Sequence, residues 1–344
     1  MLKFLNTAQL FQRNPLYGLT LRGKVPGNLI SIPLDLWPGD FQVAKCMIAG
    51  DYVTDTHVIP VSDILNFMAN PNQCPKELLV RLHSFEWLRD LRSISTNQSR
   101  KFARELIQHW ISFNHSWSKK SWLSPAWRAD IMGHRLSNWI SLFDFFGSSA
   151  DDQFRDQLLT SICQQYQHLQ RVHGRLKNVI GSFLCLKGLL FCAATLPKQK
   201  GHIPHYIKLL EKNLKRQIMP DGGHISRSPI LQAHILKDLI DLRSLLGSHQ
   251  KEDYLILQNA IQSLAPIVRL FRHGDGGLAQ LKGDIDLRYT PYLARSTTAG
   301  LVDTALSLSD VRGRPSGRAD YMGYERCSNK NSVLLLNTKV SLHP

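Results

Sequence analysis

Two glycine-rich stretches bring histidine, arginine and aspartate to the ends of expected helices. The first, residues 220–229, contains Asp-Gly-Gly, a turn sequence in which glycine takes positive φ without steric cost, followed by His224 and Arg227. Ser228 is suited to cap the next helix, and Pro229 to occupy its first position. A titratable ring and a fixed cation beside a helix N-terminus suit an anionic ligand. The alternative is an ordinary turn between two helices with a solvated histidine.

The second stretch, residues 271–278, again combines paired glycines with charged side chains and follows the next helical hairpin. Loops that are separated by two antiparallel helices lie on the same rim of a helical array, so we expect both stretches to face one cleft. In this hypothesis two histidines and one arginine act in proton transfer and catalysis, and another arginine and an aspartate bind substrate. The expected catalytic residues are His224, His273 and Arg272, and the expected binding residues are Arg227 and Asp275.

A further set of aromatic and guanidinium side chains is a candidate binding surface for acidic sugars. Trp87, Arg89, Trp127 and Arg135 lie in expected helices. Aromatic faces beside guanidinium groups suit sugar rings that carry carboxylate or sulfate. The alternative is that the tryptophans belong to the core and the arginines extend over them.

Several other kinds of site find no support in the sequence. It contains no G-x-S-x-G, P-loop, H-E-x-x-H or dinucleotide fingerprint. Asp284 and Asp286 alone are weak evidence for a metal. The six cysteines form no C-x-x-C pair, and the spacing of Cys185 and Cys192 predicts buried thiols on one helical face. We therefore expect no metal and no cofactor.

Composition predicts a globular protein with an anionic partner. A chain of 344 residues with 43% hydrophobic content is long enough for a large core and about two domains. Its formal net charge of +15 favours polyanions such as nucleic acid, anionic lipid or acidic polysaccharide. The basic residues are dispersed, and no zinc-finger spacing or RNA-binding aromatic motif is present, so nucleic acid is not the expected partner.

The sequence predicts neither a secretory signal nor a membrane span. Residues 1–14 lack a sustained apolar region and a small-residue cleavage site, which predicts a cytoplasmic location. The most apolar segment, residues 183–196, is interrupted by Lys187 and is shorter than the ~20 residues that a span needs. We expect it to be a buried core helix. The oligomeric state is not predicted.

The expected fold class is mainly α, an irregular α/α toroid of antiparallel helix pairs with a short C-terminal β-hairpin. Helical periodicity, caps and breakers predict long helices joined by short links, which favour antiparallel neighbours, and no TPR, HEAT or ankyrin signature appears. Residues 60–75 are expected to form a loop with a single helical turn. Three parts are predicted: an N-terminal arm with short helices and a small hairpin (1–75), the toroid (76–311), and a linker with the hairpin (312–344). The expected helices are 40–49, 78–91, 97–115, 127–146, 150–173, 175–196, 203–219, 229–246, 252–271 and 292–309.

The two glycine-rich stretches together resemble the heparinase II/III-like proteins of bacteria. Weaker matches are residues 37–40, 85–92 and 139–146. The resemblance covers nearly the whole chain, and it implies an α/α toroid followed by a β-sandwich domain, of which residues 312–344 look like the beginning.

The resemblance also implies β-elimination on uronic-acid-containing polysaccharide. In that chemistry a cation or amide neutralises the C5 carboxylate, a base removes the C5 proton, and an acid, often tyrosine, protonates the leaving oxygen. The family's tyrosine after Ser-Pro is replaced here by Ile230 and Leu231, and His173 and Asn178 are the nearest candidates for the family's Asn/His pair.

Two further functions therefore stay open beside a lyase: a non-catalytic glycan-binding or scaffold remnant, and a general polyanion binder. The resemblance implies the cell envelope or periplasm as the location, whereas the lack of a secretory signal predicts the cytoplasm.

Overall fold

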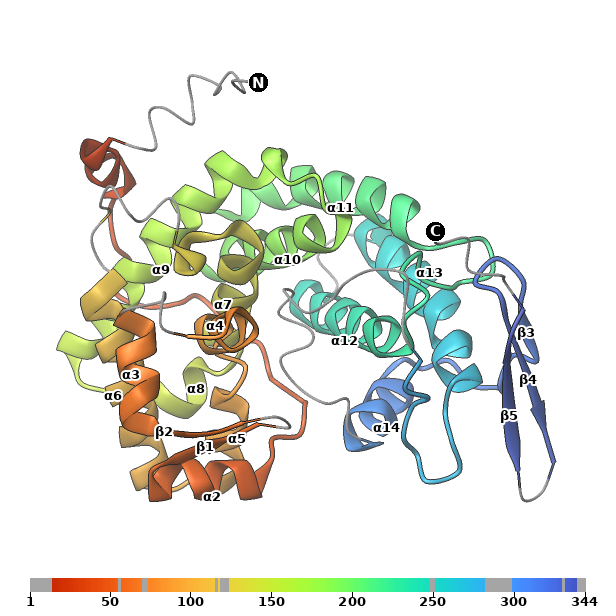
Figure 1. The fold of residues 1–344 in the computed structure, drawn as a ribbon. Coiled ribbons are helices and arrows are strands. Elements are labelled where there is room, and N and C mark those ends of the chain that lie inside the picture. The colour runs from red at the N-terminus through yellow and green to blue at the C-terminus, as the bar shows by residue number, and fades with distance from the viewer. Residues whose placement is uncertain are drawn as a thin grey trace, which may run out of the picture. The chain divides into compact units, whose positions relative to one another are not determined.

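The computed structural model describes residues 14–54, 57–69, 74–114, 117, 124–247, 251–281, 299–329 and 332–338. The described chain is mainly helical and carries a small antiparallel sheet near its C-terminus, so the predicted fold class is confirmed (Figure 1). Its internal contacts divide it into two units that meet between Ile203 and Pro204. Each unit is described by itself below. The three-part division expected from the sequence stays a prediction.

The first unit, up to residue 203, consists of short N-terminal elements followed by longer helices. A two-stranded antiparallel sheet pairs Tyr52 with Ile59. The elements are η1 (Pro15–Leu21), α2 (Phe41–Ala49), β1 (Asp51–Val53), β2 (Val58–Pro60), α3 (Val61–Ala69), α4 (Lys76–Ser84), α5 (Leu88–Ile94), α6 (Asn97–Asn114), η4 (Pro125–Trp127), α7 (Ala129–Ser141), α8 (Phe143–Phe146), α9 (Asp152–Val172), η5 (His173–Arg175), α10 (Val179–Thr195) and η6 (Lys200–His202).

Within its described residues, the second unit combines four helices with a three-stranded antiparallel sheet. Strand β4 lies between β3 and β5, and Arg326 of β4 pairs with Leu335 of β5. The predicted hairpin is confirmed, and β3 is an addition to it. The elements are α11 (Ile203–Gln217), α12 (Pro229–Leu246), α13 (Lys251–Leu270), α14 (Ala299–Leu308), β3 (Arg318–Ala319), β4 (Tyr324–Ser328) and β5 (Val333–Asn337).

Several helices begin at side chains that satisfy exposed backbone N–H groups. The Asp40 carboxylate accepts from the amides of Gln42 and Val43 at 2.9 and 3.1 Å. The Ser228 hydroxyl accepts from the Leu231 amide at 3.3 Å, with Pro229 in the first turn. Both helix starts were predicted from the sequence, because Asp and Ser supply the acceptor that the first turn lacks.

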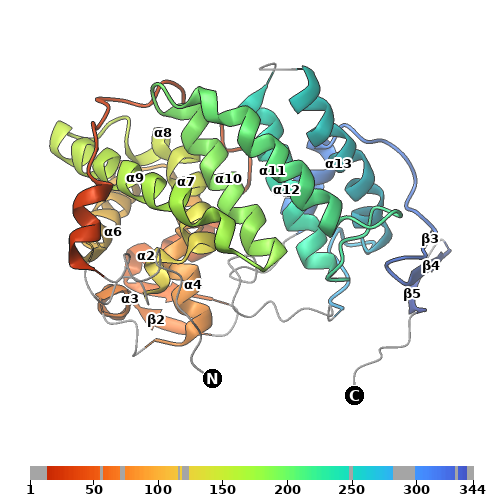
Figure 2. The same cartoon turned by 90° about the horizontal axis from the view of Figure 1, so that it is seen from above.

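The first unit is built around two helices whose backbones touch. Helices α7 and α10 pack side by side (Figure 2). A Cβ added to Gly133 of α7 would lie 2.3 Å from the carbonyl oxygen of Leu184 in α10, and one added to Gly188 would lie 2.5 Å from Gly133 Cα. Glycine at these two positions therefore sets the distance between the helices. The segment 183–196 is buried, as expected for a core helix.

Two local predictions were wrong. The expected helix over residues 78–91 is interrupted at Phe85, which has φ 59° and separates α4 from α5. This left-handed turn buries the Phe85 ring completely, at 5.0 Å from Trp87 and 5.1 Å from Trp139 between ring centroids. Residues 61–69, expected to be mostly loop, form helix α3, which buries Ile64 and Met68 one turn apart.

Cys185 and Cys192 are buried free thiols, as predicted. In the part of the chain that the structure describes, no helix is both long and apolar enough to cross a bilayer.

Candidate functional site

The first glycine-rich stretch forms a tight hairpin directly after α11. Ile218 and His224 face each other as an isolated antiparallel bridge. The Met219 amide donates to the Gly223 carbonyl at 2.8 Å, and Gly222 has φ +83°. The Asp221 carboxylate accepts from the Gly223 amide at 3.0 Å. The turn predicted from Asp-Gly-Gly is confirmed.

The second glycine-rich stretch repeats this hairpin after α13. Arg272 and Leu278 form the bridge, and the His273 amide donates to the Gly277 carbonyl at 2.9 Å. Gly276 has φ +86°, and the Asp275 carboxylate accepts from the Gly277 amide at 2.8 Å. The same glycine-containing hairpin, with an aspartate that accepts from a backbone amide of the turn, therefore occurs twice in the second unit.

His224 is buried inside the first hairpin. Its side chain is fully shielded from solvent, with Nδ1 2.7 Å from the Ser226 hydroxyl and Nε2 3.0 Å from Oε1 of Gln217. Burial lowers the pKa of His224 to about 3, because a buried imidazole is penalised in its charged form. The ring is therefore neutral at physiological pH. The solvated histidine considered from the sequence is not observed.

Arg227 adopts a left-handed backbone with φ 55° and is 6% exposed. Its Nε donates to the Met322 carbonyl at 2.7 Å, its Nη2 lies 2.5 Å from Asn337 Oδ1, and its guanidinium lies 5.1 Å from the centroid of the Tyr324 ring. A non-glycine residue at positive φ is costly and persists only where its surroundings hold it. Here those surroundings are the C-terminal sheet.

The side chains of the second hairpin are more accessible. His273 and Asp275 are exposed, and the Arg272 side chain is 36% exposed and paired with Asp303 of α14. An exposed imidazole is accessible to a bound molecule, whereas a fully buried one is not.

The three-stranded sheet contacts both hairpins. At the first hairpin, the Met322 amide donates to Asp221 Oδ2 at 2.7 Å, and a Cβ added to Gly223 would lie 2.7 Å from Met322 Cβ. At the second, Arg326 Nη1 donates to the carbonyls of Leu270 and Arg272 at 2.8 and 2.7 Å. The chain's own sheet therefore packs against both hairpins, and a cleft that both of them face stays a prediction.

Replacing Arg326 with alanine should loosen the sheet from the second hairpin. Hydrogen bonds to charged groups contribute about 1.5–3 kcal/mol, so amides of β4 and β5 should exchange with deuterium roughly 30-fold faster. The control is Arg318→Ala, since Arg318 is exposed and pairs with Asp320 of the same turn. Equal exchange in both variants would contradict this role for Arg326.

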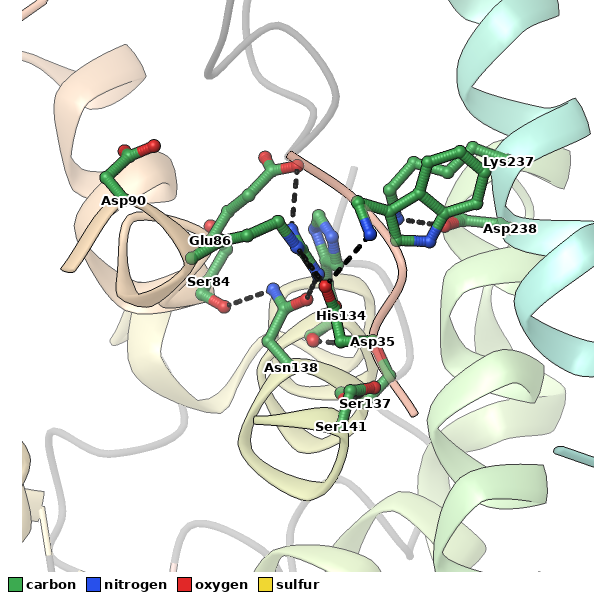
Figure 3. Close-up of polar contacts among 12 residues, drawn as sticks. Asp35, Ser84, Glu86, Asp90, His134, Ser137, Asn138, Ser141, Lys237 and Asp238 are labelled. Atoms are coloured by element: carbon green, nitrogen blue, oxygen red, sulfur yellow. Dashed lines mark hydrogen bonds and ion pairs between the residues drawn. The ribbon is translucent and has the colours of Figure 1, made fainter. Parts of the chain in front are cut away.

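In the first unit, the set Trp87, Arg89, Trp127 and Arg135 is buried, with exposures of 2, 2, 6 and 0%. Arg89 Nε lies 3.0 Å from both oxygens of Asp35, and Arg89 Nη2 donates to Asn138 Oδ1 at 3.3 Å. Asn138 Nδ2 in turn donates to the Ser84 carbonyl at 2.9 Å (Figure 3). The network ties the N-terminal arm to α5 and α7.

Arg135 is a second buried cation in this unit. It donates to Gln165 Oε1 and to the carbonyls of His83 and Ala126 at 2.8, 2.8 and 2.6 Å. Its guanidinium lies 4.3 Å from the centre of the Trp110 ring. These contacts agree with the alternative in which the tryptophans form the core and the arginines cover them.

The sequence reasoning missed several polar residues that the fold brings together around Arg89. They are Asp35, Ser84, Glu86, His134 and Asn138, and Figure 3 shows them beside helix α7. A polar residue inside an otherwise apolar helical stripe, such as Asn138 beside Trp139, was the available signal. No cluster of three or more His, Cys, Asp or Glu side chains suited to a metal is found within the described ranges. Asp284 and Asp286 lie outside the described residues.

Comparison with known proteins identifies the family. The family model described as "Heparinase II/III N-terminus" matches residues 41–256. The chain belongs to this heparinase II/III family. The resemblance stated from the two glycine-rich stretches is thereby confirmed.

Sequence identity to individual known proteins is low. "FtsZ-localized protein C" of Caulobacter vibrioides is 25% identical over 251 residues, which cover 73% of this chain and 41% of that protein. Heparan sulfate lyase HepC of Pedobacter heparinus is 16% identical, with a TM-score of 0.52 over 79% of this chain and 45% of its own. The chain spans less than half the length of both. The likeness to HepC supports the fold class expected from the sequence.

Proposed function

We propose that this protein is a polysaccharide-lyase-like protein that binds uronic-acid-containing acidic polysaccharide. The family match over residues 41–256 carries the proposal, and the net charge of +15 supports a polyanionic partner. A heparan sulfate lyase shares the fold.

If the protein turns its substrate over, the second hairpin supplies the proton transfer. A base removes the C5 proton of the uronate, the electron pair forms the C4–C5 double bond, and the bond from C4 to the leaving oxygen breaks. That oxygen then takes up a proton. His273 is exposed and follows Arg272 in the chain. The Arg272 guanidinium, which pairs with Asp303, would exchange that partner for the uronate carboxylate. His224 is a weaker candidate than the sequence suggested, because its ring is buried and its pKa is about 3.

The test is the ultraviolet absorbance of unsaturated uronate during incubation with heparan sulfate and other acidic polysaccharides. We expect His273→Ala to reduce the rate at least 100-fold, as typical for loss of a general acid or base. His224→Gln, with unfolding checked by circular dichroism, should retain most of the rate. Activity that His273→Ala leaves intact would refute the proposed role of His273.

A second candidate is binding or assembly without turnover. It is favoured by the burial of His224 and by the contacts of Arg227 with the sheet. The name of the Caulobacter relative, "FtsZ-localized protein C", supports an association with FtsZ. Sedimentation with purified FtsZ polymers tests it. Uronate production in the first assay, or no co-sedimentation in the second, would count against this candidate.

A further inference from the structure

The first unit contains a pocket of about 720 Å³ that neither proposed function uses. Its walls come from the extended arm at residues 24–28, from one face of α9, and from the turn that follows α10. All of its lining residues belong to this one unit. A volume of this size is within the range of small-molecule sites.

The rim of the pocket is cationic. Lys24, Arg171 and Lys198 line it, and the lining set contains no aspartate or glutamate. Both lysines are exposed, and no ion pair holds either of them within the described part of the chain. Two free ammonium groups on one rim favour a negatively charged ligand.

Arg171 is held in place by neighbouring residues. Its Nη1 and Nη2 donate to the hydroxyl and the carbonyl of Thr20 at 2.6 and 2.7 Å, and its guanidinium lies 5.3 Å from the centre of the Tyr17 ring. A cation that is fixed before binding loses less entropy when the ligand arrives.

The sequence around the pocket keeps acidic residues away. Residues 1–34 contain no aspartate or glutamate, and neither do residues 157–210. The arm comes from the first of these stretches, and α9 and α10 contribute their lining residues from the second. The positive potential at the rim is therefore not offset by carboxylates nearby in the sequence.

The floor of the pocket is apolar. Tyr166 and Leu196 are each 3% exposed, Cys163 is half-buried, and Pro26 and Pro197 complete the walls. Burial raises the pKa of the Cys163 thiol to about 11, which is consistent with an apolar surrounding. Such a floor favours the hydrocarbon or aromatic part of a ligand.

We propose that this pocket binds a small amphiphilic anion, with its charged group at Lys24, Arg171 and Lys198 and its apolar body over Tyr166, Leu196 and Cys163. The ligand class is an organic carboxylate, phosphate or sulfonate on an apolar frame. The residues of this pocket do not include those of the glycine-rich hairpins. Failure of the lyase proposal would therefore leave this proposal standing, and the reverse also holds.

The first experiment titrates the 344-residue chain with anilinonaphthalene sulfonate, an amphiphilic anion whose fluorescence rises on binding. Decanoate should displace the dye, and decanol, which has the same chain length without the charge, should do so at least tenfold less well. The double variant Lys24→Glu/Lys198→Glu should bind the dye at least tenfold more weakly. The matched control is Lys101→Glu/Lys208→Glu, two exposed lysines whose replacement changes the net charge equally.

A second measurement tests whether the apolar part of the ligand lies over Cys163. In a Cys46→Ser/Cys327→Ser background, saturating decanoate should slow the alkylation of Cys163 by a maleimide several-fold. Three results would overturn the proposal: equal dye binding by the two double variants, equal displacement by decanoate and decanol, or alkylation that decanoate does not slow. Each variant is first compared with the parent by circular dichroism, because unfolded protein also binds the dye.

Discussion

Gly133→Ala should lower the free energy of unfolding of the first unit by about 3 kcal/mol, the upper part of the usual range for overpacking. The added Cβ would lie 2.3 Å from the Leu184 carbonyl oxygen and 2.7 Å from Cys185 Cα. Both are backbone atoms of α10, so no side-chain rotation relieves the clash. Urea denaturation followed by circular dichroism measures the effect.

A matched control lies on the partner helix. At Gly181 of α10 an added Cβ meets nothing closer than Asp130 Cβ at 3.4 Å. Gly181→Ala should therefore leave stability unchanged or raise it by up to about 1 kcal/mol, because alanine favours the helix more than glycine. Gly188→Ala should behave like Gly133→Ala. If all three variants were equally stable, close backbone contact would not hold α7 and α10 at their distance.

Mild acid should destabilise the protein well before its carboxylates titrate. Burial lowers the pKa values of His83, His168 and His224 to about 3, from about 6.5 in an unfolded chain. Nearby arginines add to the shift at His83 and His168. As the pH falls below 6.5, the histidines bind protons in the unfolded state but stay neutral in the folded state. The stability that they contribute is therefore present above pH 6.5 and is lost as the pH falls toward 3.

Each of the three histidines contributes a loss of about 2 kcal/mol between pH 7 and pH 5 by this linkage. Two of them lie in the first unit and one in the second, so the first unit should be the more sensitive. The measurement is urea denaturation at pH 7, 6 and 5. A flat stability over this range would show that the buried rings are not neutral.

Most helices could be predicted from the sequence, because helix caps and apolar periodicity are local signals. Asp40 and Ser228 begin helices where predicted, and the apolar period identified α6, α9 and α12 closely. The break at Phe85 was missed because the apolar period continues across it. At this turn the Phe85 ring contacts Trp87, Trp110 and Trp139, the last two of which are distant in sequence.

The candidate site could be predicted only in part, because the partners of its side chains are distant in sequence. The glycines of both stretches correctly indicated an unusual backbone, since Gly222 and Gly276 have positive φ. The environment of His224 depends on Gln217 from α11, and that of Arg227 on Met322 and Asn337 from the C-terminal sheet. No local pattern reports such partners, so residues suited to an exposed ligand site were found buried or in contact with the sheet.

The two hairpins have the same backbone pairing, so each position in one has a counterpart in the other. His224 corresponds to Leu278, and Met219 to His273. Leu278 is 8% exposed and His224 is fully buried, so this position is an interior one in both copies. The first copy has placed a polar ring where the second keeps a hydrocarbon, and the second carries an exposed imidazole where the first has methionine. The two hairpins thus share one backbone form and differ in what they present: a buried, hydrogen-bonded imidazole in the first and an exposed imidazole in the second.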